Sequence, residues 1–312
     1  MAERENQLPY LQHKGKSLLV EMFARLFKEK PLGATGAVIV LAFLLVGIFA
    51  NFIAPYGIQE MTLSARLAPP SASHILGTDN LGRDLLSMII YGARISMFVG
   101  LFASSLSLVV AASIGLISGY FGGKLDLVVQ RFVDATLCFP SLFIYLSVMA
   151  AVGPGLWQVI IVLGLTFGVW RSRLIRSAVI GIKENVYVEA ATAIGSSPAR
   201  VLMRHILPNV SPVVIVYYSI TVGQMILAEA TLSFLGFGIP PPDPSWGGML
   251  SGGGRQYMEL APWMALWPGF ALALTIFGVN MLGDGIRDIL DPRLRGGVGR
   301  YGVRAKVASR EV

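Results

Sequence analysis

The sequence predicts an all-α polytopic membrane protein with six transmembrane helices in a single membrane domain. Of the 312 residues, 54% are hydrophobic and only 14% are charged, whereas a soluble domain carries roughly a quarter charged residues. The apolar residues also form long blocks, and a membrane span needs about 20 of them. A buried soluble helix bundle would not need so many uncharged runs. These runs are residues 32–59, 95–123, 135–170, 206–228 and 260–283.

Lys and Arg residues gather on one side of the predicted spans. All but four of the 25 lie near the N-terminus, in residues 124–131, in residues 171–204, or in the C-terminal segment. Cytoplasmic segments carry the excess of positive charge, so both termini and the loop at 189–209 are expected in the cytoplasm. This distribution also accounts for the net charge of +7, so no nucleic-acid partner is expected. The four exceptions are Arg66, Arg83, Arg94 and Arg255.

The spans follow from the uncharged blocks, because Gly153-Pro154-Gly155 is a turn signal that divides the third block into two spans. In the third span, Arg131 and Asp134 are nearly one turn apart and could pair, which would lower the cost of their burial. The six spans are expected at about residues 33–54, 95–118, 128–151, 157–178, 209–235 and 262–284.

An amphipathic helix is expected before the first span, at residues 18–28. Its charged residues occupy one face, and the apolar face suits a helix that lies in the membrane interface; a solvated helix packed on the protein is the alternative. The apolar face comprises Leu18, Leu19, Met22, Phe23, Leu26 and Phe27. The chain then divides into a cytoplasmic N-terminus (1–32), the transmembrane domain (33–290) and a basic cytoplasmic tail (291–312).

Two long segments are expected outside the membrane. In residues 55–94, Thr78 or Asp79 could cap a short amphipathic helix. Residues 236–261 contain many prolines and glycines, which favour a shaped loop and not a helix.

The cytoplasmic loop at 184–208 is predicted to form two short helices separated by a turn. Residues 185–194 favour a helix, and Gly195 tolerates the backbone geometry that ends one. Ser197 can cap a second helix with Pro198 in its first position, and Pro208 suits the beginning of span five. Such a projecting helix-turn-helix is suited to docking on a partner; a structured loop without a partner is the alternative.

Residues in this loop resemble the EAA loop of ABC importer permeases, the coupling helix that sits on the ATPase subunit. One departure is His205, where the general pattern has an apolar residue; RHILPN resembles the dipeptide/oligopeptide/nickel subfamily. The match covers Glu189, Ala190, Ala191, Gly195, Leu207 and Pro208.

Three further segments, at residues 76–96, 229–250 and 283–295, resemble the same subfamily, and specifically its C-type subunit with a long loop after the first span. The resemblance implies a bacterial or archaeal cytoplasmic membrane and three kinds of partner besides lipid: a second homologous permease, two ATP-binding subunits or domains, and an extracytoplasmic solute-binding protein. The chain itself has no P-loop, since the near match at Gly15-Lys16-Ser17 lacks the first glycine. ATP and Mg²⁺ are therefore expected on partner subunits, and no catalytic residue here.

Cysteine and histidine residues give no sign of a metal or cofactor site. The single cysteine, Cys138, excludes an internal disulfide and a multi-cysteine metal site. His13, His74 and His205 lie far apart and form no ligand pattern. No metal site and no cofactor are expected in this chain.

Several charged residues outside the loop are candidate sites with two interpretations each. Arg83, Asp84 and Arg94 could contact the binding protein or the pathway, or form local salt bridges. Glu229 lies late in span five, where anchoring of the following loop is favoured over contact with substrate. Glu189 could pair with a cation on the ATPase or stabilise its own helix through the N-terminal dipole.

The expected function is a permease subunit of an ATP-driven, binding-protein-dependent importer, with di- or oligopeptides as the favoured cargo. Nickel, glutathione or another small solute is the alternative cargo. An autonomous secondary transporter is the alternative class, but such proteins usually show internal repeats or charged broken helices near the midplane.

The predicted orientation can be tested by thiol labelling in a background without Cys138. A cysteine at Ser196 should react with a membrane-impermeant reagent only in inverted vesicles, because the positive charges place this loop in the cytoplasm. A cysteine at Ser251 should react only from outside. The reverse labelling pattern would overturn the orientation.

Overall fold

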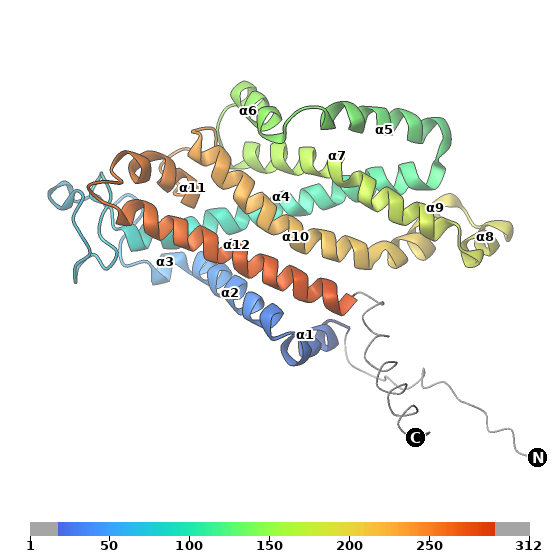
Figure 1. Ribbon diagram of the computed structural model, residues 1–312, viewed down its shortest axis with the longest axis horizontal. Coiled ribbons are helices and arrows are strands. Elements are labelled where there is room, and N and C mark those ends of the chain that lie inside the picture. The colour runs from blue at the N-terminus through green and yellow to red at the C-terminus, as the bar shows by residue number, and fades with distance from the viewer. Residues whose placement is uncertain (1–17, 291–312) are drawn as a thin grey trace, which may run out of the picture.

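The structure, a computed structural model, describes residues 18–290, so the whole predicted basic tail (291–312) and the first 17 residues lie outside the described part. Five long apolar helices run along the long axis of the molecule (Figure 1). Each is long and apolar enough to cross a membrane, and they match predicted spans one, two, four, five and six. They are α2 (Pro31–Ile48), α4 (Leu85–Phe121), α7 (Leu156–Lys183), α10 (Leu207–Phe234) and α12 (Trp263–Leu290).

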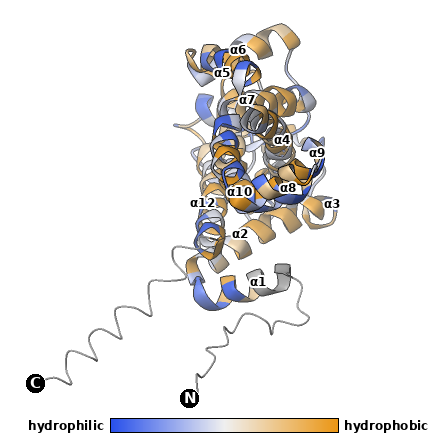
Figure 2. Cartoon of the chain, turned by 90° about the vertical axis from the view of Figure 1, so that its right-hand side faces the viewer, coloured by the Kyte–Doolittle hydropathy of each residue, from blue (hydrophilic) through white to orange (hydrophobic). Residues whose placement is uncertain are grey.

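Shorter elements precede and connect these helices. They are α1 (Leu18–Glu29), α3 (Ala50–Ile53), a 3₁₀ turn (Leu63–Ala65), α5 (Gly123–Leu137), α6 (Ser141–Val152), α8 (Val186–Ala193), α9 (Pro198–Val201), α11 (Trp246–Met249) and two π turns (Leu202–Ile206, Leu250–Gly254). Apolar residues are frequent along the long helices (Figure 2), and large apolar side chains such as Val109 and Phe277 are exposed. This surface suits lipid, and the predicted all-α membrane fold is confirmed.

The third predicted span is not a straight helix. Residues 123–152 form α5 and α6, which meet at 90°. The described residues contain six candidate spans if this bent pair is counted as one span, and five if it is not. Pro140 ends the straight path, since proline has no N–H and disfavours helical geometry in the residue before it. The Nε of Arg176 donates to Asp126 over 2.6 Å and ties α5 to α7.

The predicted ion pair inside this segment is present but wide. Arg131 and Asp134 approach within 3.9 Å, and Asp134 also pairs with Arg173 on α7. These contacts hold α5 beside α7 instead of letting it continue into α6.

Helix α4 begins ten residues earlier than the predicted second span. The cap is Asp84, whose Oδ2 accepts from the Ser87 backbone N–H at 2.8 Å, so the separate short helix capped by Thr78 or Asp79 does not exist. The Thr78 hydroxyl instead accepts from the Ala68 N–H at 2.8 Å. Thr78 and Asp79 therefore shape the loop before the helix.

The segment after α10 is also more helical than predicted, because α11 and a π turn occupy residues 246–254. The Ser245 hydroxyl accepts from the Gly248 N–H and caps α11. Trp246 is fully buried, its ring lies against Gly92, and its Nε1 donates to the Ile89 carbonyl at 3.1 Å. This long-range contact draws the segment back onto α4.

Glycines allow α4 and α7 to approach closely. A Cβ at Gly115 or Gly119 on α4 would lie within 3.0 Å of α7, and one at Gly164 or Gly168 on α7 would lie within 3.0 Å of α4. Each pair is spaced by four residues, as in the small-residue interfaces of membrane helices. Without side chains at these positions the two backbones meet directly.

Glycines also allow α2 and α12 to approach closely. A Cβ at Gly36 on α2 would lie 2.5 Å from the Gly278 carbonyl of α12, and Gly33 and Gly285 face each other. The buried Leu26 of α1 packs against this glycine pair, and Lys30 bonds Asp288 at 2.6 Å. Helix α1 is thus attached to the bundle, while its placement in a membrane interface stays a prediction.

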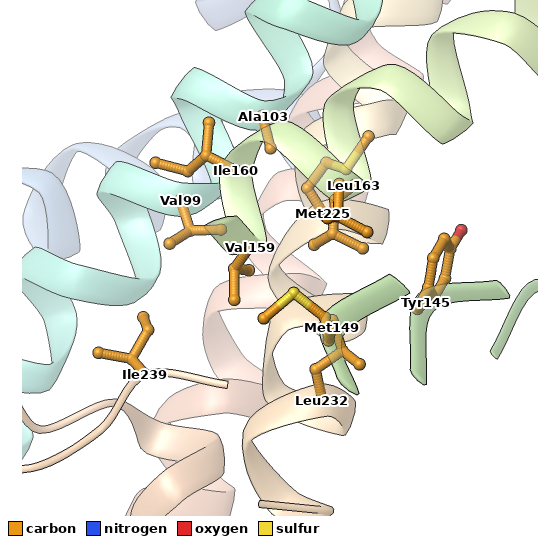
Figure 3. Packing of buried hydrophobic residues seen from close by; sticks show 11 residues of the cluster. Val99, Ala103, Tyr145, Met149, Val159, Ile160, Leu163, Met225, Leu232 and Ile239 are labelled. Carbon is orange, nitrogen blue, oxygen red and sulfur yellow. The ribbon is translucent and has the colours of Figure 1, made fainter. Parts of the chain in front are cut away.

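A cluster of buried apolar side chains attaches α6 to the bundle (Figure 3). Met149 and Tyr145 of α6 pack on side chains from the first halves of α4 and α7 and from the second half of α10. Ile239 closes one end of the cluster. The other members are Val99, Ala103, Val159, Ile160, Val162, Leu163, Met225 and Leu232.

Replacing Gly168 by Leu should destabilise the fold. The new side chain would meet the Val110 side chain, 2.6 Å from its own Cβ, and overpacking of this kind costs about 1–3 kcal/mol. Gly181→Leu is the matched control, because a Cβ there meets nothing within 4 Å. Thermal unfolding in detergent should show a lower midpoint for the first variant alone; equal midpoints would contradict the close α4–α7 contact.

Candidate functional site

The α8–α9 turn projects from one end of the bundle (Figure 1). Gly195 has φ +83°, its N–H bonds the Thr192 carbonyl at 2.9 Å, and the Ser196 N–H bonds the Ala191 carbonyl at 3.1 Å. This pair of bonds is a Schellman motif, which ends a helix with a residue in the left-handed region. A Cβ at Gly195 would meet no atom within 4 Å, so the backbone angle alone demands glycine there.

A second helical turn follows as predicted. The Ser197 hydroxyl accepts from the Arg200 N–H at 3.4 Å, and Pro198 occupies the first position of α9. Helix α9 then continues through a π turn into α10 as one segment from Pro198 to Phe234. Pro208 lies in the first turn of α10, as predicted, but it does not interrupt the segment that α9 begins. The π turn lets the helix continue because the Leu207 N–H reaches back to the Leu202 carbonyl.

One face of α8 holds it to the bundle. Val188 and Ala191 are buried, and Val188 belongs to an apolar cluster with Ile175 of α7 and Ile206 and Val210 at the start of α10. This packing links α8 to both long helices.

The opposite face of α8 is open. Glu189, Ala190 and the side chains of Val186 and Ile194 are exposed, the last two by 79% and 83%. Exposed large apolar side chains on a rigid projection mark a surface for contact. Of the other predicted loop residues, Ala191 and Gly195 support this projection, and Leu207 and Pro208 lie in the first turn of α10.

At the other end of the bundle, Arg83 and Asp84 have local partners. The Arg83 Nε bonds the buried Asp79 at 2.7 Å. The buried Asp84 caps α4, accepts from the Ser87 hydroxyl at 2.8 Å and lies 3.0 Å from His74 Nδ1. These bonds fit the local interpretation of both residues.

Arg94 also has an internal role, since its Nε donates to the Gly47 carbonyl at 2.9 Å and its NH2 lies 3.5 Å from the Ile48 carbonyl. These carbonyls end α2, where a cation is stabilised by the helix dipole and by unsatisfied acceptors. Arg94 therefore joins α4 to the end of α2.

Glu229 is fully buried where α10 meets the segment that follows it. It accepts from the Ser233 hydroxyl at 2.7 Å, and the Ser96 hydroxyl of α4 lies 3.4 Å away. Ser233 in turn accepts from the Ile239 N–H at 3.4 Å. A buried carboxyl needs such partners, and this arrangement fits an anchor for the loop.

Arg171 lies near the middle of α7 with an exposed side chain, inside the predicted fourth span. On the sequence alone it counts among the cytoplasmic charges and is not singled out as a candidate site residue. Its position directly after the long uncharged run was the only signal. Within residues 18–290, no group of three or more His, Cys, Asp or Glu side chains could hold a metal.

Comparison with known proteins matches two sequence families. Residues 111–296 match the family described as the inner membrane component of binding-protein-dependent transport systems. Residues 17–70 match the N-terminal transmembrane domain of oligopeptide transport permease C.

Individual proteins are similar over nearly the whole chain. The dipeptide transport system permease protein DppC of Alkalihalophilus pseudofirmus is 41% identical over 88% of this chain and 90% of its own length. The glutathione transport system permease protein GsiD of Pectobacterium atrosepticum is 34% identical over 92% and 96%.

A solved structure of the MetNI methionine ABC transporter, in an inward-facing conformation, has a similar fold. The TM-score is 0.54, with 16% identity over 65% of this chain and 96% of the solved chain. At this identity the likeness concerns the fold alone.

Proposed function

The chain belongs to the binding-protein-dependent ABC permease family, as a C subunit of the peptide importer type, and we propose that it imports di- or oligopeptides as one of two homologous permeases. The family is made of multi-pass permease subunits without catalytic activity, and its importers work with ATPase and solute-binding partners. The observation that carries the substrate proposal is the 41% identity with a dipeptide permease over 88% of the chain.

In this proposal the exposed face of α8 docks on the ATPase subunit. The exposed Val186 and Ile194 would bury apolar surface in a groove of the partner, and Glu189 between them would meet a cation. Ala190 supports this arrangement because its small side chain lets the partner approach. The charge distribution that favours a cytoplasmic loop supports it independently.

The same proposal explains why α8 is fixed so firmly. Val188 packs on side chains at the end of α7 and at the start of α10. A displacement of α8 by closing ATPase subunits would therefore move both long helices, and access to the pathway would change from one side to the other.

A glutathione permease is among the relatives, and it provides the second candidate cargo. The solute-binding protein selects the cargo, so calorimetric titration of the binding protein that stimulates this complex distinguishes the candidates. We expect it to bind dipeptides or oligopeptides. Binding of glutathione or Ni²⁺ without binding of any peptide would contradict the substrate proposal.

Changing Gly195 to Val should uncouple the assembled complex. A side chain in the left-handed region costs about 1–2 kcal/mol, and a β-branched one is less tolerated still. The turn would then release α8 from its place, and substrate-stimulated ATP hydrolysis and uptake should fall about tenfold. The spans are remote from Gly195, so assembly should survive.

Gly195→Asn is the matched control, because asparagine tolerates the left-handed conformation. It should retain most of the stimulated ATPase activity and uptake. If Gly195→Val transports as well as the unchanged protein, the α8 turn is not the coupling element.

A further inference from the structure

A groove runs along the exposed side of α10. A hollow of about 540 Å³ lies between α6, α7 and α10, and a second of about 350 Å³ lies between α7, α10 and the end of α12. Arg171 and Gln224 line both hollows. The groove extends along α10 from Thr231 to Pro212, which corresponds to about 28 Å at 1.5 Å per residue, close to the thickness of a bilayer core.

Arg171 places a positive charge in the middle of this groove. Its NH2 lies 3.4 Å from the Gln224 side-chain oxygen, and within residues 18–290 no carboxylate lies within 4.0 Å of it. In contrast, the neighbouring Arg173 forms an ion pair with Asp134, and Arg176 forms one with Asp126. A charge on a membrane-spanning helix such as α7 is costly where it meets lipid, so it faces protein or a water-filled path.

Two other residues that line the same groove carry donors. The Tyr145 hydroxyl and the Trp170 Nε1 are buried and have no hydrogen-bond partner among the described residues. Tyr145 is 4% exposed, and its hydroxyl points away from the apolar cluster that holds its ring (Figure 3). Atoms of this chain cover both donors, so they lie behind the groove wall and do not reach a solute in the groove.

We propose that Arg171 and Gln224 form a carboxylate-binding station midway along the translocation pathway, which holds a carboxylate of the solute as it passes. This inference rests on the proposed function and adds the chemical group that the pathway recognises.

The chemistry of the station selects an anion. A guanidinium binds a carboxylate through two parallel hydrogen bonds, and the side-chain amide of Gln224 adds a donor beside it. Dipeptides and glutathione, the solutes named for two relatives, both carry a free carboxylate, whereas a nickel ion does not.

An acidic residue of the second permease is the other possible partner of Arg171. The shape of the groove favours the solute, because the groove follows the membrane-crossing direction over most of its thickness and continues on both sides of Arg171. A single interchain ion pair would require no such length.

The test compares Arg171→Gln, Arg171→Lys and the matched control Arg173→Gln in the assembled complex with its ATPases and peptide-loaded binding protein. Peptide uptake into vesicles is measured with the loaded binding protein at saturation, so that capture of the solute does not limit the rate. Co-purification and thermal unfolding of the complex report assembly.

Arg171→Gln should slow uptake roughly tenfold, the effect of losing one charge-assisted hydrogen bond, while assembly stays normal. Arg171→Lys retains the charge, so its uptake rate should fall less. Arg173→Gln should import peptide at the rate of the unchanged complex. Normal uptake by Arg171→Gln would overturn the station. A failure of that variant alone to assemble would also overturn it, in favour of a contact with the second permease. Failure of the unchanged complex to import any peptide would instead reject the proposed function.

Discussion

The direct contact between the backbones of α4 and α7 is the constraint on which the rest of the structure depends. Lipid tails are as apolar as leucine, so helices in a membrane associate through close packing and polar contacts. Four glycines, Gly115, Gly119, Gly164 and Gly168, provide that packing along both helices. Helix α10 joins the pair where Ile226 packs against Gly100 of α4. Since α7 leads directly into α8, the pair also determines where the projecting turn lies.

Polar side chains fix the ends of this bundle. Arg94 satisfies carbonyls at the end of α2, Asp84 caps α4, and Glu229 binds hydroxyls where α10 turns into the following loop. Most of these charges face inward and serve the architecture. Arg171 differs from them because its side chain is exposed in a groove, with an amide as its hydrogen-bond partner.

The parts of the fold that depend on local chemistry could be predicted from the sequence. Long uncharged runs located five spans, and Gly195, Ser197 and Pro198 located the turn after α8, because apolar length and helix caps act over a few residues. The bend between α5 and α6 has a local signal in Pro140 that the prediction of a straight third span did not use, whereas the Asp126–Arg176 pair that ties α5 to α7 joins residues far apart in the sequence.

The short helix α11 was missed for a similar reason, since burial of Trp246 against Gly92 depends on the assembled bundle. In the candidate site, the sequence located the turn and its residues, but it did not separate the buried Val188 face from the exposed Glu189 face. Arg171 was not singled out, because counting charges groups an arginine at the end of an apolar run with the adjacent loop.

The continuity of α9 and α10 makes residues 198–234 a single lever arm. At 1.5 Å per residue its 37 residues measure about 55 Å, so a tilt of about 5° shifts one end against the other by roughly 5 Å. One end carries the turn beside α8, and the other carries Glu229 and the loop that it anchors. If the segment moves as one body, a displacement at either end moves the other, and what binds at one end must then bias the other by the same free energy.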